Sequence, residues 1–176
     1  MRVRHLEDVK NLMLSIDVRD VSRRIKDFIR QVYRDSGART VFVGVSGGVD
    51  SATVAKLTID ALGPQHVFAL VMPHHGITSK KDLEDAYMLL DMLGIEYATI
   101  ETADICSVVK RRLSAFVDLD DKAYGNIIAR VRMIVLYGFA NAEMGIVAGT
   151  SDKSERLIGY FTKWGDAAAD FFPIMD

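Results

Sequence analysis

A short apolar, β-branched run that ends in glycines and opens into a helical pattern constrains the fold of this chain most. The run covers residues 40–45, and the loop after it reads Ser46-Gly47-Gly48-Val49-Asp50-Ser51. A continuous apolar run of this length predicts a parallel strand that is buried on both faces. A helical pattern follows over residues 50–62 and stops at Gly63-Pro64, so the unit reads as strand, tight turn and helix.

The same alternation continues along the chain. The patterns predict further strands at residues 67–72, 95–100 and 145–149, and helices at 17–33, 78–93, 104–116 and 126–144. Strands that alternate with helices at this spacing imply right-handed crossovers and a mainly parallel sheet. The predicted fold class is therefore α/β, with a Rossmann-like sheet between two helical layers, and ligands are expected at the carboxyl ends of the strands.

Length and charge limit the organisation and the partners. The chain has 176 residues and a net charge of −2, so we expect one domain over residues 1–176 and no general electrostatic attraction to nucleic acid. We expect no signal peptide and no membrane partner, because no apolar run is long enough. Cys106, the only cysteine, is expected to pack in the core. These features favour a cytoplasmic location.

The loop at residues 46–51 has the properties of a phosphate site. Adjacent glycines allow the backbone to approach a ligand, and the following helix presents free N–H groups and a positive dipole end. No lysine follows the glycines, so this is not a Walker A loop. Asp50 would repel phosphate unless a cation lies between them, so it predicts Mg²⁺. The alternative is a tight turn in which Asp50 only favours the helix start.

The string Ser-Gly-Gly-Xaa-Asp-Ser after a buried strand resembles the pyrophosphate loop of the N-type ATP pyrophosphatases. This resemblance implies an adenine nucleotide alpha hydrolase-like fold and cleavage of ATP between its α- and β-phosphates. Two further segments narrow the family. The run Gly149-Thr150-Ser151-Asp152-Lys153-Ser154-Glu155, with its continuation over residues 159–174, resembles ammonia-dependent NAD synthetases, and so does the helix start at residues 125–133.

The resemblance implies a role for each matched position. We expect ATP to be bound by Gly44, Val45, Ser46, Gly47, Gly48, Val49, Asp50, Ser51 and Thr150. Magnesium is expected on Asp50 and Glu155, and deamido-NAD on Arg130, Lys163 and Asp170. The reaction would join ammonia to deamido-NAD through a nicotinate adenylate and release AMP and pyrophosphate. Positioning and charge stabilisation would suffice without a covalent nucleophile. The family also implies a homodimer, and the apolar residues 131–139 are expected to form either that contact or part of the buried core.

Each role has a plainer alternative. Thr150 or Ser151 would then cap the next helix, and Glu155 would only be an acidic residue in its first turn. Arg130 would be an exposed helix residue, with Arg132 facing elsewhere on that helix. Lys163 and Asp170 would be loop charges.

Two other functions remain open: another AMP-forming ATP pyrophosphatase, of the GMP synthetase or tRNA-modifying type, or a non-catalytic ATP- or AMP-binding module. The family usually continues beyond the position of Asp176, so we expect a C-terminally shortened form. The pair His74-His75 follows the strand at 67–72 and is expected to border the adenine site, without a metal.

Overall fold

The computed structural model describes residues 16–175, in which strands and helices alternate as expected. The strands are β1 (Val41–Gly44), β2 (Val67–Val71), β3 (Glu96–Thr99) and β4 (Ile146–Ala148). The helices are α2 (Val18–Ser36), α3 (Val49–Leu62), α4 (Lys80–Leu93), α5 (Ala103–Leu113), α6 (Asp121–Ala142) and α7 (Lys153–Ile158), with the 3-10 turns η1 (Pro64–His66) and η2 (Asp166–Ala168).

The strands form one parallel sheet in the order β3-β2-β1-β4. Val41 of β1 lies opposite Val67 of β2 on one side and opposite Ile146 of β4 on the other. An isolated parallel bridge joins Ala148 to Phe171, which adds one further position at the β4 edge. The predicted α/β class and the mainly parallel sheet are confirmed.

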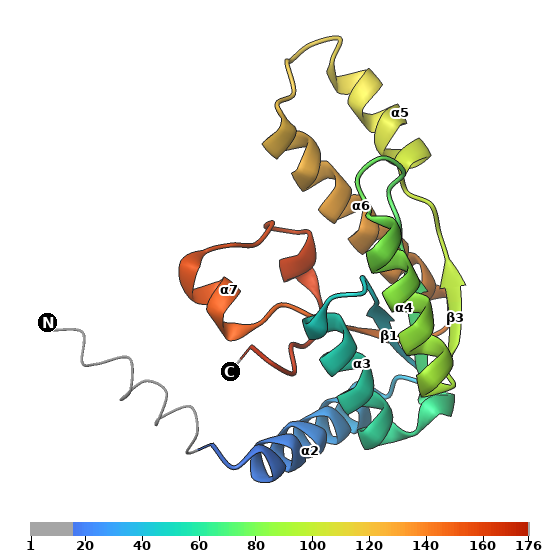
Figure 1. Ribbon diagram of the computed structural model, residues 1–176, viewed down its shortest axis with the longest axis vertical. Helices are drawn as coiled ribbons and strands as arrows, with labels where there is room; N and C mark the ends of the chain where they lie inside the picture. The colour runs from blue at the N-terminus through green and yellow to red at the C-terminus, as the bar shows by residue number, and fades with distance from the viewer. Residues whose placement is uncertain (1–15, 176) are drawn as a thin grey trace, which may run out of the picture.

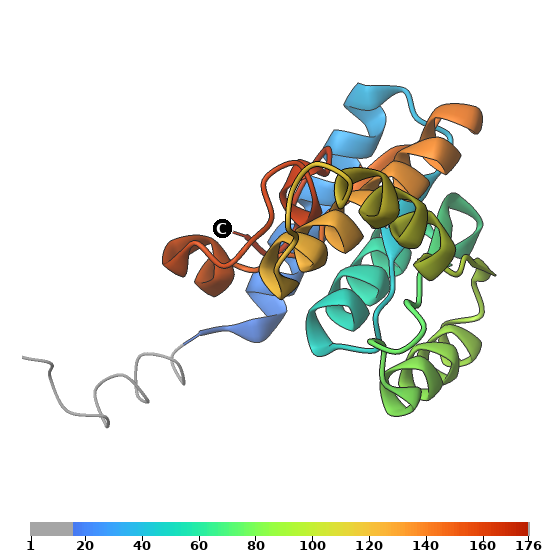
Figure 2. The ribbon, with the colours of Figure 1, turned by 90° about the horizontal axis from the view of Figure 1, so that it is seen from above.

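Alternate residues of β1 face the two helical layers. Val41 and Val43 belong to a buried cluster with residues of α2, α3 and α4, whereas Phe42 belongs to a second cluster with residues of α6. Figure 2 shows α3 and α4 on one side of the sheet and α6 on the other. Burial on both faces explains why β1 reads as a continuous apolar run rather than an alternating one.

Helix α6 begins earlier than the sequence pattern predicted. Its first residue is Asp121, because the side chain of Asp120 caps the helix by accepting a 2.7 Å hydrogen bond from the N–H of Ala123. The polar residues 118–121, which lie before the predicted helix start, therefore contain the cap. Val131, Met133 and Leu136 of α6 are buried in two of the core clusters, so most of the apolar residues 131–139 belong to the core.

Helix α5 packs beside the first half of α6 and forms a third small cluster around Cys106, which is buried as expected. Figure 1 shows α5 and the start of α6 lying beyond the end of the sheet. Within residues 16–175, no helix combines the length and the apolar character that crossing a membrane requires.

Candidate active site

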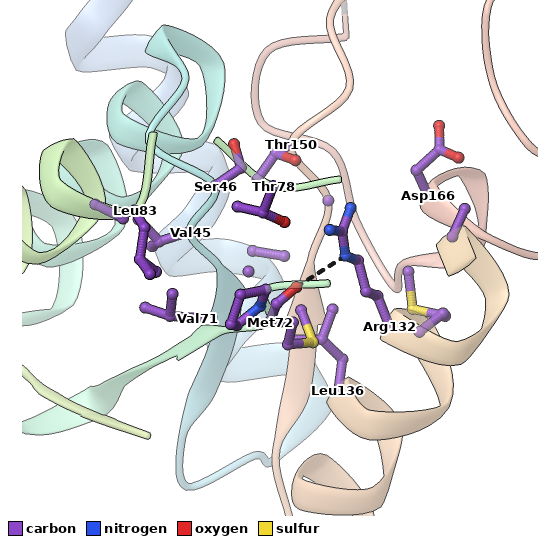
Figure 3. A pocket seen from close by; sticks show the side chains of 17 residues that line it. Val45, Ser46, Val71, Met72, Thr78, Leu83, Arg132, Leu136, Thr150 and Asp166 are labelled. Atoms are coloured by element: carbon purple, nitrogen blue, oxygen red, sulfur yellow. Dashed lines mark hydrogen bonds between the residues drawn. The ribbon is translucent and has the colours of Figure 1, made fainter. Parts of the chain in front are cut away.

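A cavity of about 290 Å³ opens at the carboxyl ends of β1 and β4, where the strand order of the sheet reverses. From β1 the chain passes to β2 on one side and later returns to β4 on the other, so the strand order reverses between β1 and β4, where ligands bind in sheets of this kind. Gly44, Val45 and Ser46 line the cavity from β1, and Gly149 and Thr150 line it from β4. Figure 3 shows these two segments meeting around the cavity. The sequence predicted this edge of the sheet as the site.

The phosphate loop (residues 44–51) turns sharply at Gly47, whose φ of +89° is in the left-handed region. A Cβ placed at Gly47 would lie 2.1 Å from the carbonyl oxygen of Asp82 in α4. Only glycine therefore allows both this turn and the close approach of α4.

Two serines hold the phosphate loop from inside. The buried hydroxyl of Ser51 donates to the carbonyl oxygen of Gly48 at 2.9 Å and accepts from the N–H of Ser46 at 3.2 Å. The Ser46 hydroxyl lies 3.1 Å from that of Ser51 and accepts from the N–H of Gly48 at 3.3 Å. The proton of Ser51 is thus used within the loop, which fixes the backbone around the site.

Helix α3 begins without a side-chain cap, because its N-cap residue is Gly48. The first amide N–H groups of a helix have no partner within the helix, so those of α3 are available to an anion. Asp50 lies in this first turn and is partly buried, whereas Val49 is exposed. The phosphate loop therefore offers backbone donors and one carboxylate side by side.

The stretch of chain that follows strand β4, residues 149–170, is named the β4 segment, and it brings Thr150 to the cavity. Helix α7 is capped by Asp152, not by Thr150 or Ser151, and Asp152 and Glu155 form a capping box. The N–H of Glu155 donates to Asp152 Oδ1 at 2.7 Å, and the N–H of Asp152 donates to Glu155 Oε2 at 3.3 Å. These contacts lower the pKa of Asp152, chiefly through the N–H of Glu155. Thr150 is therefore not used as a cap.

Arg130 and Lys163 lie together but do not line the cavity. Both side chains are exposed, and Arg130 Nε donates to the backbone oxygen of Lys163 at 3.2 Å. The ammonium group of Lys163 lies 5.4 Å from the ring centroid of Trp164, which has a positive φ of 61°. The pair forms a positive surface on the segment that the family resemblance assigned to deamido-NAD.

Asp170 has a structural role that the sequence pattern did not show. Its Oδ2 accepts from the N–H of Val147 in β4 at 2.7 Å, and its Oδ1 lies 2.9 Å from the hydroxyl of Tyr137 in α6. Burial, and then the carboxylate of Asp170, raise the pKa of Tyr137. Asp170 thus joins β4 to α6, and it is not among the residues lining the cavity. Its predicted contact with deamido-NAD stays a prediction.

Arg132 lines the cavity and faces away from the exposed Arg130 on α6, as expected, but its place in the cavity was not predicted. Its Nε donates to the backbone oxygen of Met72 at 3.0 Å, as the dashed line in Figure 3 shows. The position of Arg132 in the helical repeat could have predicted that it faces inward. Arg132 is four residues from both Ile128 and Leu136, which are buried, so it shares their face.

His74 is buried at the end of β2, next to residues of the cavity wall. Its Nε2 lies 2.9 Å from the Tyr124 hydroxyl, and its backbone N–H donates to the Thr78 hydroxyl, which lines the cavity. Within residues 16–175, no group of three or more His, Cys, Asp or Glu side chains is arranged to hold a metal by itself. Asp50 and Glu155 therefore do not belong to a complete protein-made metal site.

Comparisons with known proteins agree on one family. A family model described as NAD synthase matches residues 21–176. An NH(3)-dependent NAD(+) synthetase from Hyperthermus butylicus is 47% identical over 165 residues, which are 93% of this chain and 59% of that relative. The chain spans about three fifths of the length of the curated relatives it matches.

Two solved structures are similar in fold and sequence. An NH3-dependent NAD synthetase from Campylobacter jejuni, in complex with the nitrate ion, has a TM-score of 0.85 and 38% identity, with 92% of this chain and 69% of that chain covered. An NMN synthetase from Francisella tularensis has a TM-score of 0.86 and 32% identity, with 92% and 66% covered.

Proposed function

The chain belongs to the NAD synthase family, and we propose that it converts deamido-NAD to NAD in an ATP-dependent reaction with ammonia. The observation that carries the proposal is the cavity at the carboxyl ends of β1 and β4, which is lined by both the phosphate loop and the β4 segment. A nucleotide in this cavity would meet the phosphate loop, which leads into the uncapped start of α3, and the hydroxyl of Thr150.

The residues present fit a magnesium ion that is carried by ATP. Mg²⁺ is commonly held by one or two carboxylates together with phosphate oxygens and water. Asp50 beside the free N–H groups of α3 suits such a shared site, and we assign Glu155 as a second carboxylate. The ion would supply charge screening between ATP and the acceptor and stabilise the departing pyrophosphate.

The chain's own residues position two anions for reaction. The phosphate loop binds the ATP phosphates, while Arg130 and Lys163 supply positive charge for deamido-NAD. The nicotinate carboxylate attacks the α-phosphorus and displaces pyrophosphate, and ammonia then attacks the resulting adenylate to give the amide and AMP. Orientation and charge stabilisation account for these steps, as no covalent bond to the protein is needed.

The proposal includes a cytoplasmic homodimer, as the family resemblance implies. The β4 segment supports it, because Leu157, Ile158 and Trp164 are large apolar side chains that are at least 70% exposed. Similarity to an NMN synthetase favours one alternative acceptor, nicotinate mononucleotide, which carries the same reacting carboxylate.

Pyrophosphate release from Mg-ATP and ammonium tests the proposal, with deamido-NAD, nicotinate mononucleotide, xanthosine monophosphate or no acceptor. We expect release, together with NAD, only when deamido-NAD is present. Release with the mononucleotide alone would select the alternative acceptor, and release with xanthosine monophosphate alone would overturn both.

If the chain binds ATP but stays silent, the assay is repeated after joining it to the part of a curated relative that it does not cover. Recovery of NAD formation supports the proposal. Continued silence favours a nucleotide-binding module without catalysis.

A further inference from the structure

Arg132 is the only positively charged residue among the described residues that line the cavity. It projects from α6, and its Nε is fixed by the backbone oxygen of Met72. Figure 3 shows its guanidinium group directed into the cavity, on the side where Thr78 and Thr150 lie. One edge of the guanidinium is thus anchored, while its other nitrogens extend inward.

No carboxylate is in ion-pair contact with Arg132 within residues 16–175. It forms no ion pair there, since each ion pair found joins exposed or partly exposed side chains of α2, α3 or α4. Two acidic residues lie nearby: Glu101, whose charge partly offsets the burial that lowers the pKa of Arg132, and Asp166, which lines the same cavity. Glu101 accepts from the N–H groups of His75 and Ala103, and Asp166 accepts from the N–H of Thr162.

The Nη atoms of Arg132 therefore face open space. No fully buried side-chain nitrogen or oxygen in the described residues lacks a partner, and the Nη atoms have no protein acceptor there. Burial lowers the pKa of Arg132, although a guanidinium remains charged at neutral pH. A partly buried charge without a contacting counter-ion is unfavourable, so an anion that enters the cavity gains a strong partner.

We propose that Arg132 binds the α-phosphate of the nucleotide through its Nη groups. The inference rests on the proposed function insofar as that function makes ATP the ligand. A guanidinium fork matches two phosphate oxygens, and Ser46 of the phosphate loop lines the same cavity. The apolar lining, including Leu83, Met133 and Leu136, suits the nucleoside instead. Negative charge grows at the α-phosphate during attack, so the same contact favours adenylate formation.

Calorimetric binding of AMP and of adenosine to the 176-residue chain tests this assignment, because the two ligands differ only in the α-phosphate. The wild-type chain should bind AMP more tightly than adenosine. Arg132→Gln should weaken AMP binding about 10- to 100-fold and change adenosine binding less than about twofold. Arg132→Lys, which keeps the charge but not the fork, should weaken AMP binding about 3- to 10-fold. Arg112→Gln, at an exposed position of α5, is the matched control and should change neither affinity.

If Arg132→Gln weakened the affinities for AMP and adenosine equally, the proposal would be overturned, and the guanidinium would instead contact the nucleoside. A wild-type chain that does not distinguish AMP from adenosine would also overturn it. Circular dichroism checks folding, and if Arg132→Gln does not fold, Arg132→Lys is judged by the same comparison. Neither ligand needs an acceptor, so this result is independent of whether the chain forms NAD.

Discussion

The phosphate loop and the β4 segment meet at one cavity, but contacts of different range hold them in place. The hydrogen bonds of Ser46 and Ser51 in the phosphate loop span at most five residues. In the β4 segment, the bonds Asp170–Val147, Tyr137–Asp170 and Thr162–Asn126 span 23, 33 and 36 residues. The first region is shaped mainly by its own sequence, and the second by the elements around it. Asp50 in the first region can thus serve the ligand alone, whereas Asp170 in the second joins elements of the fold.

The largest effect on activity is expected from Asp50→Ala, which tests whether the phosphate loop separates chemistry from stability. Loss of the carboxylate should lower magnesium-dependent ATP turnover at least about 100-fold. The free energy of unfolding should fall by less than about 1 kcal/mol, since only a favourable helix-dipole contact is lost. Pyrophosphate release and urea unfolding measure the two effects, with exposed Asp91→Ala in α4 as the control. Normal release by Asp50→Ala would refute the metal role.

Gly47→Ala should give the largest loss of stability, because it disturbs the close approach between the phosphate loop and α4. The new Cβ would meet the Asp82 oxygen at a positive φ, and we expect a loss of about 2–4 kcal/mol in urea unfolding. Gly76→Ala is the matched control: its φ is +83°, but no atom lies within 4 Å of the added Cβ. It should lose only about 1 kcal/mol. Equal losses would show that backbone strain alone matters at Gly47.

In the β4 segment, Asp170→Ala should lower the free energy of unfolding while leaving nucleotide affinity nearly unchanged, the reverse of Asp50→Ala. It leaves the N–H of Val147 and the hydroxyl of Tyr137 without their partner, which should cost about 1–3 kcal/mol in urea unfolding. Tyr137→Phe removes only the hydroxyl and should cost about 1 kcal/mol. AMP affinity should stay within about threefold in both variants, because neither residue lines the cavity. Unchanged stability in Asp170→Ala would contradict the joining role.

The smallest expected effect concerns the local cap inside the β4 segment. The folded pKa of Asp152 is lowered, so its charge stabilises the fold above its unfolded pKa, near 3.9, and this contribution is lost as pH falls through the folded pKa. Asn also caps helices well, so Asp152→Asn removes mainly the charge. The stability gap between wild type and variant should be present at pH 6–7 and close below about pH 4 in urea unfolding. A gap independent of pH would contradict this origin.

The difference in contact range also explains what could be predicted from the sequence. The buried strand, the turn at Gly47 and the start of α3 were all predictable, because glycine conformation and helix periodicity are local properties. The alternation that predicted the parallel sheet is equally local. The helix predicted over residues 78–93 is observed as α4, which Ser79 caps by accepting a hydrogen bond from the N–H of Asp82.

The features that were missed depend on neighbours distant in the chain. The hydroxyl of Ser51 turns inward because Gly48 and Ser46 surround it in the folded loop. Asp170 reads as a loop charge until β4 and α6 lie beside it. Arg132 is the exception, since its helical phase relative to Leu136 was readable and would have placed it in the cavity.

The pairing of β4 with β1 has a consequence for when the site can form. Val41 and Ile146 are adjacent in the sheet although 105 positions separate them in the chain, and Phe171 joins the same edge later still. Such pairing contributes to a high contact order and slows assembly. During synthesis, the phosphate loop leaves the ribosome long before Thr150 does, so the nascent chain carries half a cavity. Nucleotide retention by the emerging chain would therefore mark the moment at which the sheet is complete.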